Sequence, residues 1–243
     1  MTRPFLITAA AIALFCSPCG GALISEFEPN PAGTDPPTTI ELFGTAGESF
    51  TYQLYSIEND GFNGTVDRFY ELSGTFDSNG LVVFSGLEDL ENPSFTLILS
   101  EGGADLDGED LDANNDGGLD TSNLGTILDV VGVSDEVDDD ATLYSNVLGG
   151  SSILFNGEFE PLTAFRSGSS GEFFNTVTVD FGTADERLGV FDSAGNEVSE
   201  SLFDFSPFGT TFGSINATAI PEPSSIVALS IAMAGCVSRR RRR

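Results

Sequence analysis

The stretch Leu23-Ile-Ser-Glu-Phe-Glu28 and the later Thr39-Ile-Glu-Leu-Phe43 contain the pattern that decides the fold. In the first segment, strict alternation would place Ile24 and Glu26 on one face and Phe27 on the other, which is typical of a half-buried strand. Prolines and an asparagine fill the connector between the two segments and favour turns there. The opening of the chain therefore predicts two consecutive strands.

The same two-residue period recurs further along the chain. Strands are predicted at residues 50–57, 80–84, 94–100, 126–133 and 176–181. Residues 188–191 and 197–198 flank the turn sequence Asp192-Ser-Ala-Gly-Asn196, which predicts a hairpin. No long helical period is present outside the two ends of the chain. The sequence therefore predicts an all-β fold.

The charge balance excludes several classes of protein. The 243 residues include 38 acidic and nine basic side chains, with no histidine or tryptophan and a formal net charge of −29. Between residues 23 and 219 the only cations are Arg68, Arg166 and Arg187. Nucleic-acid binding needs clustered cations, so it is excluded. The many carboxylates repel one another, which favours bound counter-ions. The 21 phenylalanines argue for a packed core rather than a disordered chain.

Residues 101–140 hold 14 carboxylates, and their segment 101–123 is predicted to be an acidic loop. Such a run is most simply a solvated surface loop. The alternative is a structural calcium site, because the order Asp-x-Asn-x-Asp-Gly follows the first positions of an EF-hand loop. The ligands predicted on this reading are Asp112, Asn114, Asp116, Gly118 (through its carbonyl) and Asp120.

The acidic loop departs from the EF-hand pattern at its twelfth position. Asn123 stands there in place of a bidentate glutamate, and no helices are predicted on either side. The loop is more similar to the Asp-rich calcium loops of extracellular bacterial proteins, with Asp105, Asp107 or Asp110 as further candidate ligands. A second acidic turn, residues 134–140, either adds another cation site or is simply solvated.

Catalytic chemistry is limited by the residues that are missing. Without histidine there is no Ser-His-Asp or Cys-His arrangement, and Cys16, Cys19 and Cys236 lie near the two ends of the chain. A pair of carboxylates hydrolysing a glycosidic bond is the remaining enzymatic alternative. A carbohydrate-binding module would need an exposed aromatic platform, for which four tyrosines are present. We expect a non-catalytic protein.

Both ends of the chain carry export signals. Arg3, the apolar residues 5–15 and small residues up to Ala22 predict a signal peptide over 1–22 that signal peptidase removes after Ala22. At the other end, Pro221-Glu-Pro223 precedes the apolar run 226–237, which is short for a membrane-spanning helix. Five arginines close the chain: Arg239, Arg240, Arg241, Arg242 and Arg243. They favour the cytoplasmic side of a membrane.

The C-terminal arrangement, Pro221-Glu222-Pro223 followed by an apolar helix and an arginine cluster, resembles a PEP-CTERM sorting signal over residues 220–243. This resemblance implies a secreted bacterial protein handed to an exosortase, a membrane-embedded cysteine protease-transpeptidase that acts near the triplet. It implies a location at the outer surface or in an extracellular polysaccharide matrix. The membrane is then a partner, at least transiently, through the C-terminal helix.

The two opening strands, with their Ile-Ser-Glu and Ile-Glu-Leu sequences, resemble the start of a lamin-tail domain over about residues 23–100. That resemblance implies an immunoglobulin-like β-sandwich with a binding or structural role. The predicted organisation is then a signal peptide (1–22), a β-sandwich ectodomain (23–215), a stalk (216–219) and the sorting signal (220–243). A calcium-stabilised surface protein is the expected function, and a glycosidase-like hydrolase acting on matrix polymers is the alternative.

Overall fold

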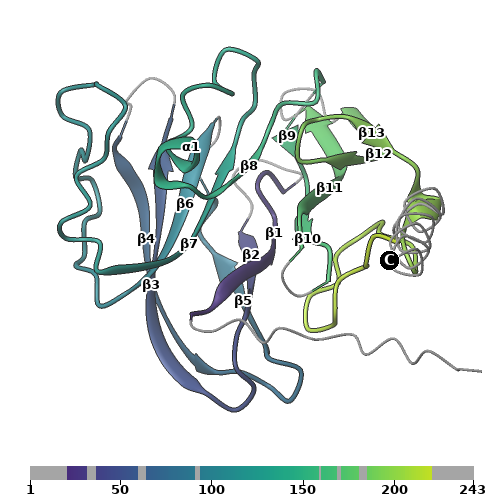
Figure 1. Ribbon diagram of the computed structural model, residues 1–243, viewed down its shortest axis with the longest axis horizontal. Helices are drawn as coiled ribbons and strands as arrows, with labels where there is room; N and C mark the ends of the chain where they lie inside the picture. The colour runs from purple at the N-terminus through teal and green to yellow at the C-terminus, as the bar shows by residue number, and fades with distance from the viewer. Residues whose placement is uncertain are drawn as a thin grey trace, which may run out of the picture.

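The computed structural model describes residues 21–31, 37–59, 64–90, 94–158, 160–168, 171–180 and 185–220. Within these ranges the protein is predominantly β and forms two sheets that pack face to face, as predicted for a sandwich (Figure 1). The predicted signal helix and C-terminal apolar helix lie outside the described residues. Among the residues that are described, none forms a helix with the length and apolarity needed to cross a bilayer.

The first sheet has the strand order β13-β12-β11-β10-β1-β2-β5, with β9 paired to β11. Its strands are β1 (Leu23–Phe27), β2 (Thr38–Phe43), β5 (Leu81–Leu87), β9 (Glu160–Pro161), β10 (Ala164–Arg166), β11 (Phe173–Asp180), β12 (Asp185–Asp192) and β13 (Glu197–Val198). All of these pairings are antiparallel. The predicted hairpin is confirmed, because β12 and β13 pair antiparallel. The Asp192 carboxylate shapes the turn between them by accepting hydrogen bonds from the backbone N–H groups of Ala194 and Asn196.

The second sheet has the order β4-β3-β6-β7-β8. Its strands are β3 (Ser49–Glu58), β4 (Val66–Thr75), β6 (Phe95–Glu101), β7 (Thr126–Val133) and β8 (Ser151–Ile153). The β7–β8 pair is parallel and the others are antiparallel. The short helix α1 (Tyr144–Leu148) connects this parallel pair, and a 3-10 turn, η1 (Glu200–Leu202), follows β13.

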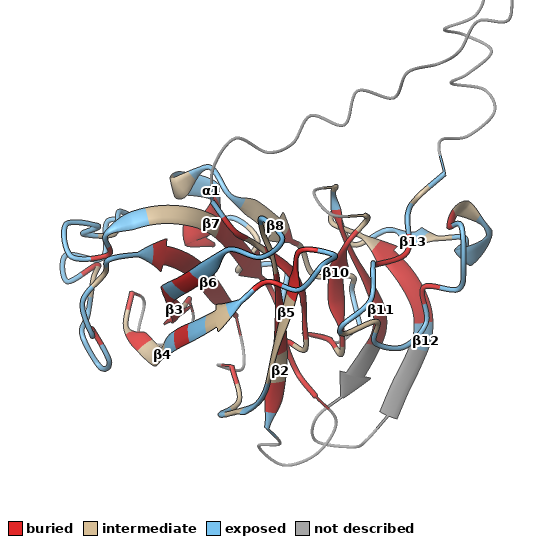
Figure 2. Cartoon of the chain, turned by 90° about the horizontal axis from the view of Figure 1, so that it is seen from below, coloured by how far each residue is buried: buried red, intermediate tan, exposed pale blue. Residues whose placement is uncertain are grey.

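The main core lies between the two sheets, where Figure 2 shows buried residues concentrated along the facing strands. Phe27 from β1 and Phe173 from β11 meet edge to face there, with ring centroids 6.0 Å apart. Leu54 and Leu97 enter the same cluster from β3 and β6 of the opposite sheet, and each is fully buried. Burying apolar surface from both sheets in one cluster supplies the main driving force for their association.

The strict alternation predicted for the first strand is wrong, because β1 contains a β-bulge. Its register with β2 shifts between Ile24 and Glu26, so Ser25 has no partner of its own. As a result Ile24 and Phe27 both point into the main core, whereas Glu26 lies on the opposite face of the sheet. An extra residue in one strand changes which side chains share a face.

Chain segments without regular structure cover the outer face of each sheet. The acidic loop and the adjoining Leu124 cover the second sheet, where Leu106 and Leu124 pack with Tyr144 of α1. The C-terminal strap, which we define as residues 203–220, covers the first sheet with Phe203 and Ala217. Figure 1 shows these two coverings on opposite sides of the molecule. The acidic loop is therefore anchored by leucines, in contrast to a purely solvated loop.

One buried ion pair joins the two sheets. Arg166 on β10 donates from Nη2 to both carboxylate oxygens of Asp129 on β7, at 2.8 Å each. The backbone of Ile24 on β1 closes the arrangement, since its N–H donates to Asp129 and its carbonyl accepts from Arg166 Nε. The guanidinium also lies 4.2 Å from the centre of the Phe173 ring. Burial raises the pKa of Asp129, and Arg166 opposes that rise.

We expect Arg166→Met to lower the free energy of unfolding by about 3–5 kcal/mol, because Asp129 would be left buried without a cation. Arg68→Met is the matched control. It removes a partly exposed arginine that pairs with neighbouring carboxylates, and we expect a loss of about 1 kcal/mol or less. Urea unfolding of both variants measures the difference, and equal losses would contradict a special role for the buried pair.

Candidate functional site

Asp112 is the centre of the loop in which calcium ligands were predicted. Its side chain is buried, and its Oδ1 accepts a hydrogen bond from the backbone N–H of Asp116 at 3.0 Å. Its Oδ2 accepts from the N–H of Gly117 and from the Tyr144 hydroxyl, both at 2.9 Å. Asn115, with a φ of 51°, completes the tight turn. The backbone therefore turns around the Asp112 carboxylate, which also links the loop to α1 through its hydrogen bond with Tyr144.

The other predicted ligands lie at the surface of the same loop. Asn114, Asp116, Gly118 and Asp120 are all exposed. Asn114 donates to Asp116 Oδ2 at 2.8 Å, whereas the Asp120 carboxylate accepts from the N–H of Ser122 in the next turn. The structure thus brings Asp112, Asn114 and Asp116 into one hydrogen-bonded turn but directs Asp120 elsewhere.

Metal-ligand geometry is not preformed in this loop. In the parts of the chain that the structure describes, no three carboxylate or cysteine side chains are arranged to hold an ion. A depression of about 420 Å³ lies beside the loop, lined in part by Asp112, Asn115 and Tyr144. Asp112 Oδ1 accepts one hydrogen bond and keeps a second lone pair for an ion, whereas its Oδ2 accepts two hydrogen bonds. Any further ligands would come from the exposed oxygens of the loop.

The second acidic turn has its own close carboxylates. Ser94 Oγ lies 2.7 Å from Asp135 Oδ1 and 2.7 Å from Asp139 Oδ2. A hydroxyl carries a single hydrogen, so both contacts are hydrogen bonds only when one carboxylate is protonated. Burial, together with the nearby Asp139 charge, raises the pKa of Asp135. This turn therefore joins the residue before β6 to the segment after β7.

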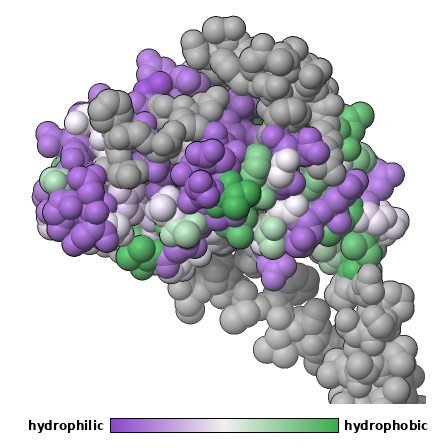
Figure 3. Space-filling view, turned by 90° about the horizontal axis from the view of Figure 1, so that it is seen from above, coloured by the Kyte–Doolittle hydropathy of each residue, from purple (hydrophilic) through white to green (hydrophobic). Residues whose placement is uncertain are grey.

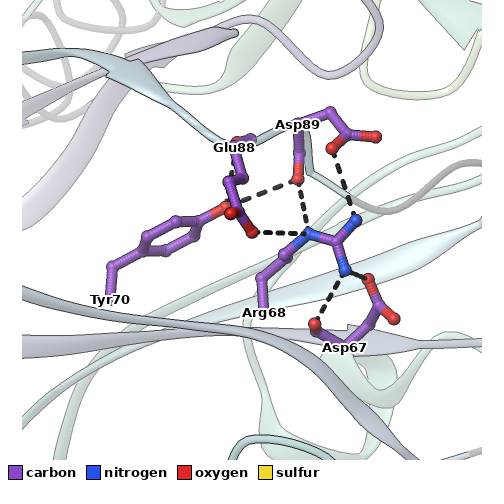
Figure 4. Close-up of polar contacts among 5 residues, drawn as sticks. All are labelled: Asp67, Arg68, Tyr70, Glu88 and Asp89. Carbon is purple, nitrogen blue, oxygen red and sulfur yellow. Dashed lines mark hydrogen bonds and ion pairs between the residues drawn. The ribbon is translucent and has the colours of Figure 1, made fainter. Parts of the chain in front are cut away.

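A third group of acids surrounds Arg68 on β4 (Figure 4). Arg68 Nε donates to the backbone carbonyl of Asp89 at 3.1 Å, and its Nη1 pairs with Asp67. The Tyr70 hydroxyl donates to the carbonyl of Glu88 at 2.9 Å. A polar groove of about 330 Å³ runs past these residues to Asp105 in the acidic loop. The sequence prediction missed this groove and also missed β4, which carries it.

Two buried glutamates under the C-terminal strap form the most unusual polar cluster. Glu26 on β1 and Glu41 on β2 are directly paired across the strands and are 1% and 0% exposed. Glu26 accepts from the Thr211 N–H at 2.8 Å and from the Thr211 hydroxyl at 2.7 Å. Glu41 Oε2 accepts from the Gly213 N–H at 2.6 Å, while its Oε1 has no hydrogen-bond partner.

The pKa values of Glu26 and Glu41 are set mainly by burial, and no cation is among the groups that shift them. Burial raises the pKa of Glu41 to about 7, assisted by the charges of Glu26 and Asp77. Burial also raises the pKa of Glu26, against the hydrogen bonds from Thr211. A close acid pair in which one member has a raised pKa is what a carboxylate hydrolase would need. This pair, however, lies beneath the strap and is closed to a polymer in this arrangement.

The strap continues to the residue before the Pro-Glu-Pro triplet. Residues 216–219, predicted as a stalk, are held in place: Asn216 and Ala217 are buried, and Asn216 Nδ2 donates to the Ser25 carbonyl at 3.0 Å. The Ile220 N–H donates to the Leu202 carbonyl at 2.6 Å. The backbone polar groups of this segment thus find partners in the domain, which is why the segment packs rather than extends.

The predicted processing positions lie at the borders of the described chain. Ala22, the residue before the predicted cut, is 1% exposed and belongs to the main core cluster. A cut after it would therefore remove one methyl group from that cluster. Pro221, Glu222, Pro223 and the five terminal arginines lie outside the described residues.

The C-terminus is the part of the chain that known proteins explain. Residues 219–243 match the PEP-CTERM protein-sorting motif, which agrees with the signal predicted from the sequence. No curated protein and no solved structure matches the chain. The motif supports an exported protein that an exosortase processes, located at the cell surface or outside the cell. The match covers the sorting signal alone and gives no information on the role of the sandwich.

We expect the Glu26–Glu41 pair to make stability depend on pH. The folded state raises the pKa of Glu41 from an ordinary 4.5 to about 7, so it binds the proton more tightly than the unfolded chain does. The free energy of unfolding therefore falls as pH rises from about 4.5 to about 7, by about 1–3 kcal/mol, and this contribution is constant above that range.

Glu41→Gln tests this expectation, because glutamine keeps the shape of the side chain without the charge. We expect urea unfolding to show a gain over the parent chain at pH 8 and little difference at pH 4.5. Glu71→Gln, which removes an exposed charge on β4, is the matched control for general repulsion. A Glu41→Gln profile as steep as that of the control would refute the expectation.

Proposed function

We propose that this protein is a non-catalytic, calcium-stabilised surface protein, delivered by an exosortase system and associated with extracellular polysaccharide. The match of residues 219–243 to the sorting motif is the observation that carries the proposal. Signal peptidase would act at the other end, after Ala22. The described acids support a structural role, since Glu26 and Asp112 are buried, Asp129 is 10% exposed, and all three are hydrogen-bonded within the fold.

A lamin-tail-like identity for the sandwich belongs to the same proposal. It rests on the Ile-Ser-Glu sequence in β1 and the Ile-Glu-Leu sequence in β2, which lie side by side in the first sheet. The polysaccharide partner is supported by the groove beside Arg68, where Asp67, Glu88 and Asp105 offer acceptors to sugar hydroxyl groups. Tyr70 adds an aromatic wall to the same groove.

Processing at the sorting signal is tested by changing the triplet. Proline restricts the preceding residue and removes a backbone donor, so the triplet separates the domain from the apolar run. We expect Pro221→Ala, Glu222→Ala and Pro223→Ala together to leave the chain unprocessed in a host that carries an exosortase. Mass spectrometry of the C-terminus measures processing. Ser224→Ala is the control, and normal processing of the triple variant would contradict the proposal.

The calcium component assigns different roles to the loop residues. Asp112 shapes the loop through the Asp116 N–H, the Gly117 N–H and the Tyr144 hydroxyl. The exposed oxygens of Asn114, Asp116 and Gly118 are open to a hard cation, and so is Asp120, which the fold directs toward the next turn. Calcium prefers such oxygen ligands, and extracellular modules bind it with a Kd of about 10⁻⁴–10⁻³ M.

We expect 10 mM calcium to stabilise the folded chain by about 1–3 kcal/mol relative to excess EDTA, because it binds the folded state alone. The Asp116→Asn, Asp120→Asn double variant should melt like the parent in EDTA and lose this response. Asp112→Ala should lower the Tm in both conditions, since Tyr144 loses its acceptor. Asp138→Asn, an exposed acid in the second turn, is the charge control. Identical melting of the parent with calcium and EDTA would reject the site.

A further inference from the structure

The C-terminal strap differs in surface chemistry from the rest of this acidic protein. Its 18 residues contain one carboxylate, Asp204, and no basic side chain. The Asp204 carboxylate is itself engaged, because its Oδ1 accepts a hydrogen bond from the Thr218 N–H at 2.8 Å. The face in Figure 3 is largely hydrophilic, with apolar residues in separate spots. The strap is therefore an almost uncharged segment on a molecule of net charge −29.

Exposed apolar side chains are concentrated in this strap. Seven large apolar side chains are exposed in the described part of the chain, and four belong to the strap. Those four are Phe205 (44% exposed), Phe208 (41%), Ile215 (60%) and Ile220 (51%). More than half of the large apolar side chains exposed in the described residues therefore lie within one 18-residue segment, which makes this segment a candidate contact surface.

The length of chain beyond the strap limits what this surface can face. Ile220 is fixed by its hydrogen bond to Leu202, and the apolar run of the sorting signal begins at residue 226. Six Cα steps separate the two, which span at most about 20 Å even when fully extended. Because the apolar run and the terminal arginines direct the tail to a membrane, the strap must lie close to the lipid surface while the tail is in place.

We propose that the strap is a lipid-docking surface, which seats the sandwich on the outer face of the membrane that holds the sorting signal. The inference rests on the proposed sorting function and adds the orientation of the domain. Phe205, Phe208, Ile215 and Ile220 enter the interfacial region of the bilayer, where apolar and aromatic side chains are favoured. The buried glutamates Glu26 and Glu41 hold the other side of the strap to the sheet through Thr211 and Gly213.

The charge of the domain favours a zwitterionic lipid as the partner. The domain carries 37 carboxylates between residues 23 and 219, so an anionic surface repels it. Docking by the strap therefore depends on apolar contact and weakens as anionic lipid is added.

The absence of tryptophan from the chain gives a direct test. Phe208→Trp places a single fluorophore in the strap, and Val147→Trp places one on α1, where Val147 is 65% exposed. The full-length chain of each variant is incorporated into phosphatidylcholine vesicles, with and without brominated lipid. We expect blue-shifted emission from the residue 208 fluorophore that brominated lipid quenches, and water-like, unquenched emission from residue 147. Adding Phe205→Ser and Ile215→Ser to Phe208→Trp should reduce the quenching.

The possible results separate this inference from the sorting function. Water-like emission from residue 208 in a chain that sediments with vesicles overturns lipid docking and leaves the membrane-directed tail intact. A chain that fails to sediment with vesicles contradicts the membrane role of the tail and the docking together. Blue-shifted emission without bromine quenching shows that protein, such as a second copy of the chain, covers the strap, and this also overturns the lipid assignment.

Discussion

The ion pair between Asp129 and Arg166 joins the two sheets, and the backbone of Ile24 is hydrogen-bonded to both of these side chains. It uses one of only three arginines available between residues 23 and 219. A buried ion pair is costly to break, because either partner alone would be a desolvated charge. The shortage of cations then constrains every other buried acid. N–H and hydroxyl groups donate hydrogen bonds to Glu26, Glu41 and Asp112. The raised pKa of Glu41 also favours its neutral form.

The two coverings of the sandwich divide the surface into chemically distinct sides. The acidic loop packs its leucines on the second sheet and presents carboxylates to solvent, which suits hydrated cations and sugar hydroxyl groups. The strap packs Phe203 on the first sheet and presents apolar side chains instead. The strap leads directly into the sorting motif, so the apolar side and the sorting motif belong to the same end of the molecule. The acidic side is then left facing away from the strap.

Much of the strand content could be predicted from residue alternation, including the β12–β13 hairpin and the turn at Asp192. The prediction failed where local pattern and tertiary position disagree. No strand was predicted around Arg166, yet it lies buried in β10, and its partner Asp129 is 37 residues away in the chain. The edge strand β4 was missed, since Asp67, Arg68 and Glu71 interrupt its alternation. Asp112 was predicted as a calcium ligand from its spacing, but its hydrogen bond to Tyr144 could not be predicted from that spacing.

The sequence by itself determined the all-β class, the acidic character and the sorting signal, because these depend on composition, short-range period and contiguous motifs. Tertiary structure alone decided which acids are buried and what lies next to them. The bulge at Ser25 places Glu26 beside Glu41, and the strap returns over both from 170 or more residues away in the chain. Such contacts are set by the register of paired strands and by the packing of covering segments. Neither leaves a local pattern in the sequence.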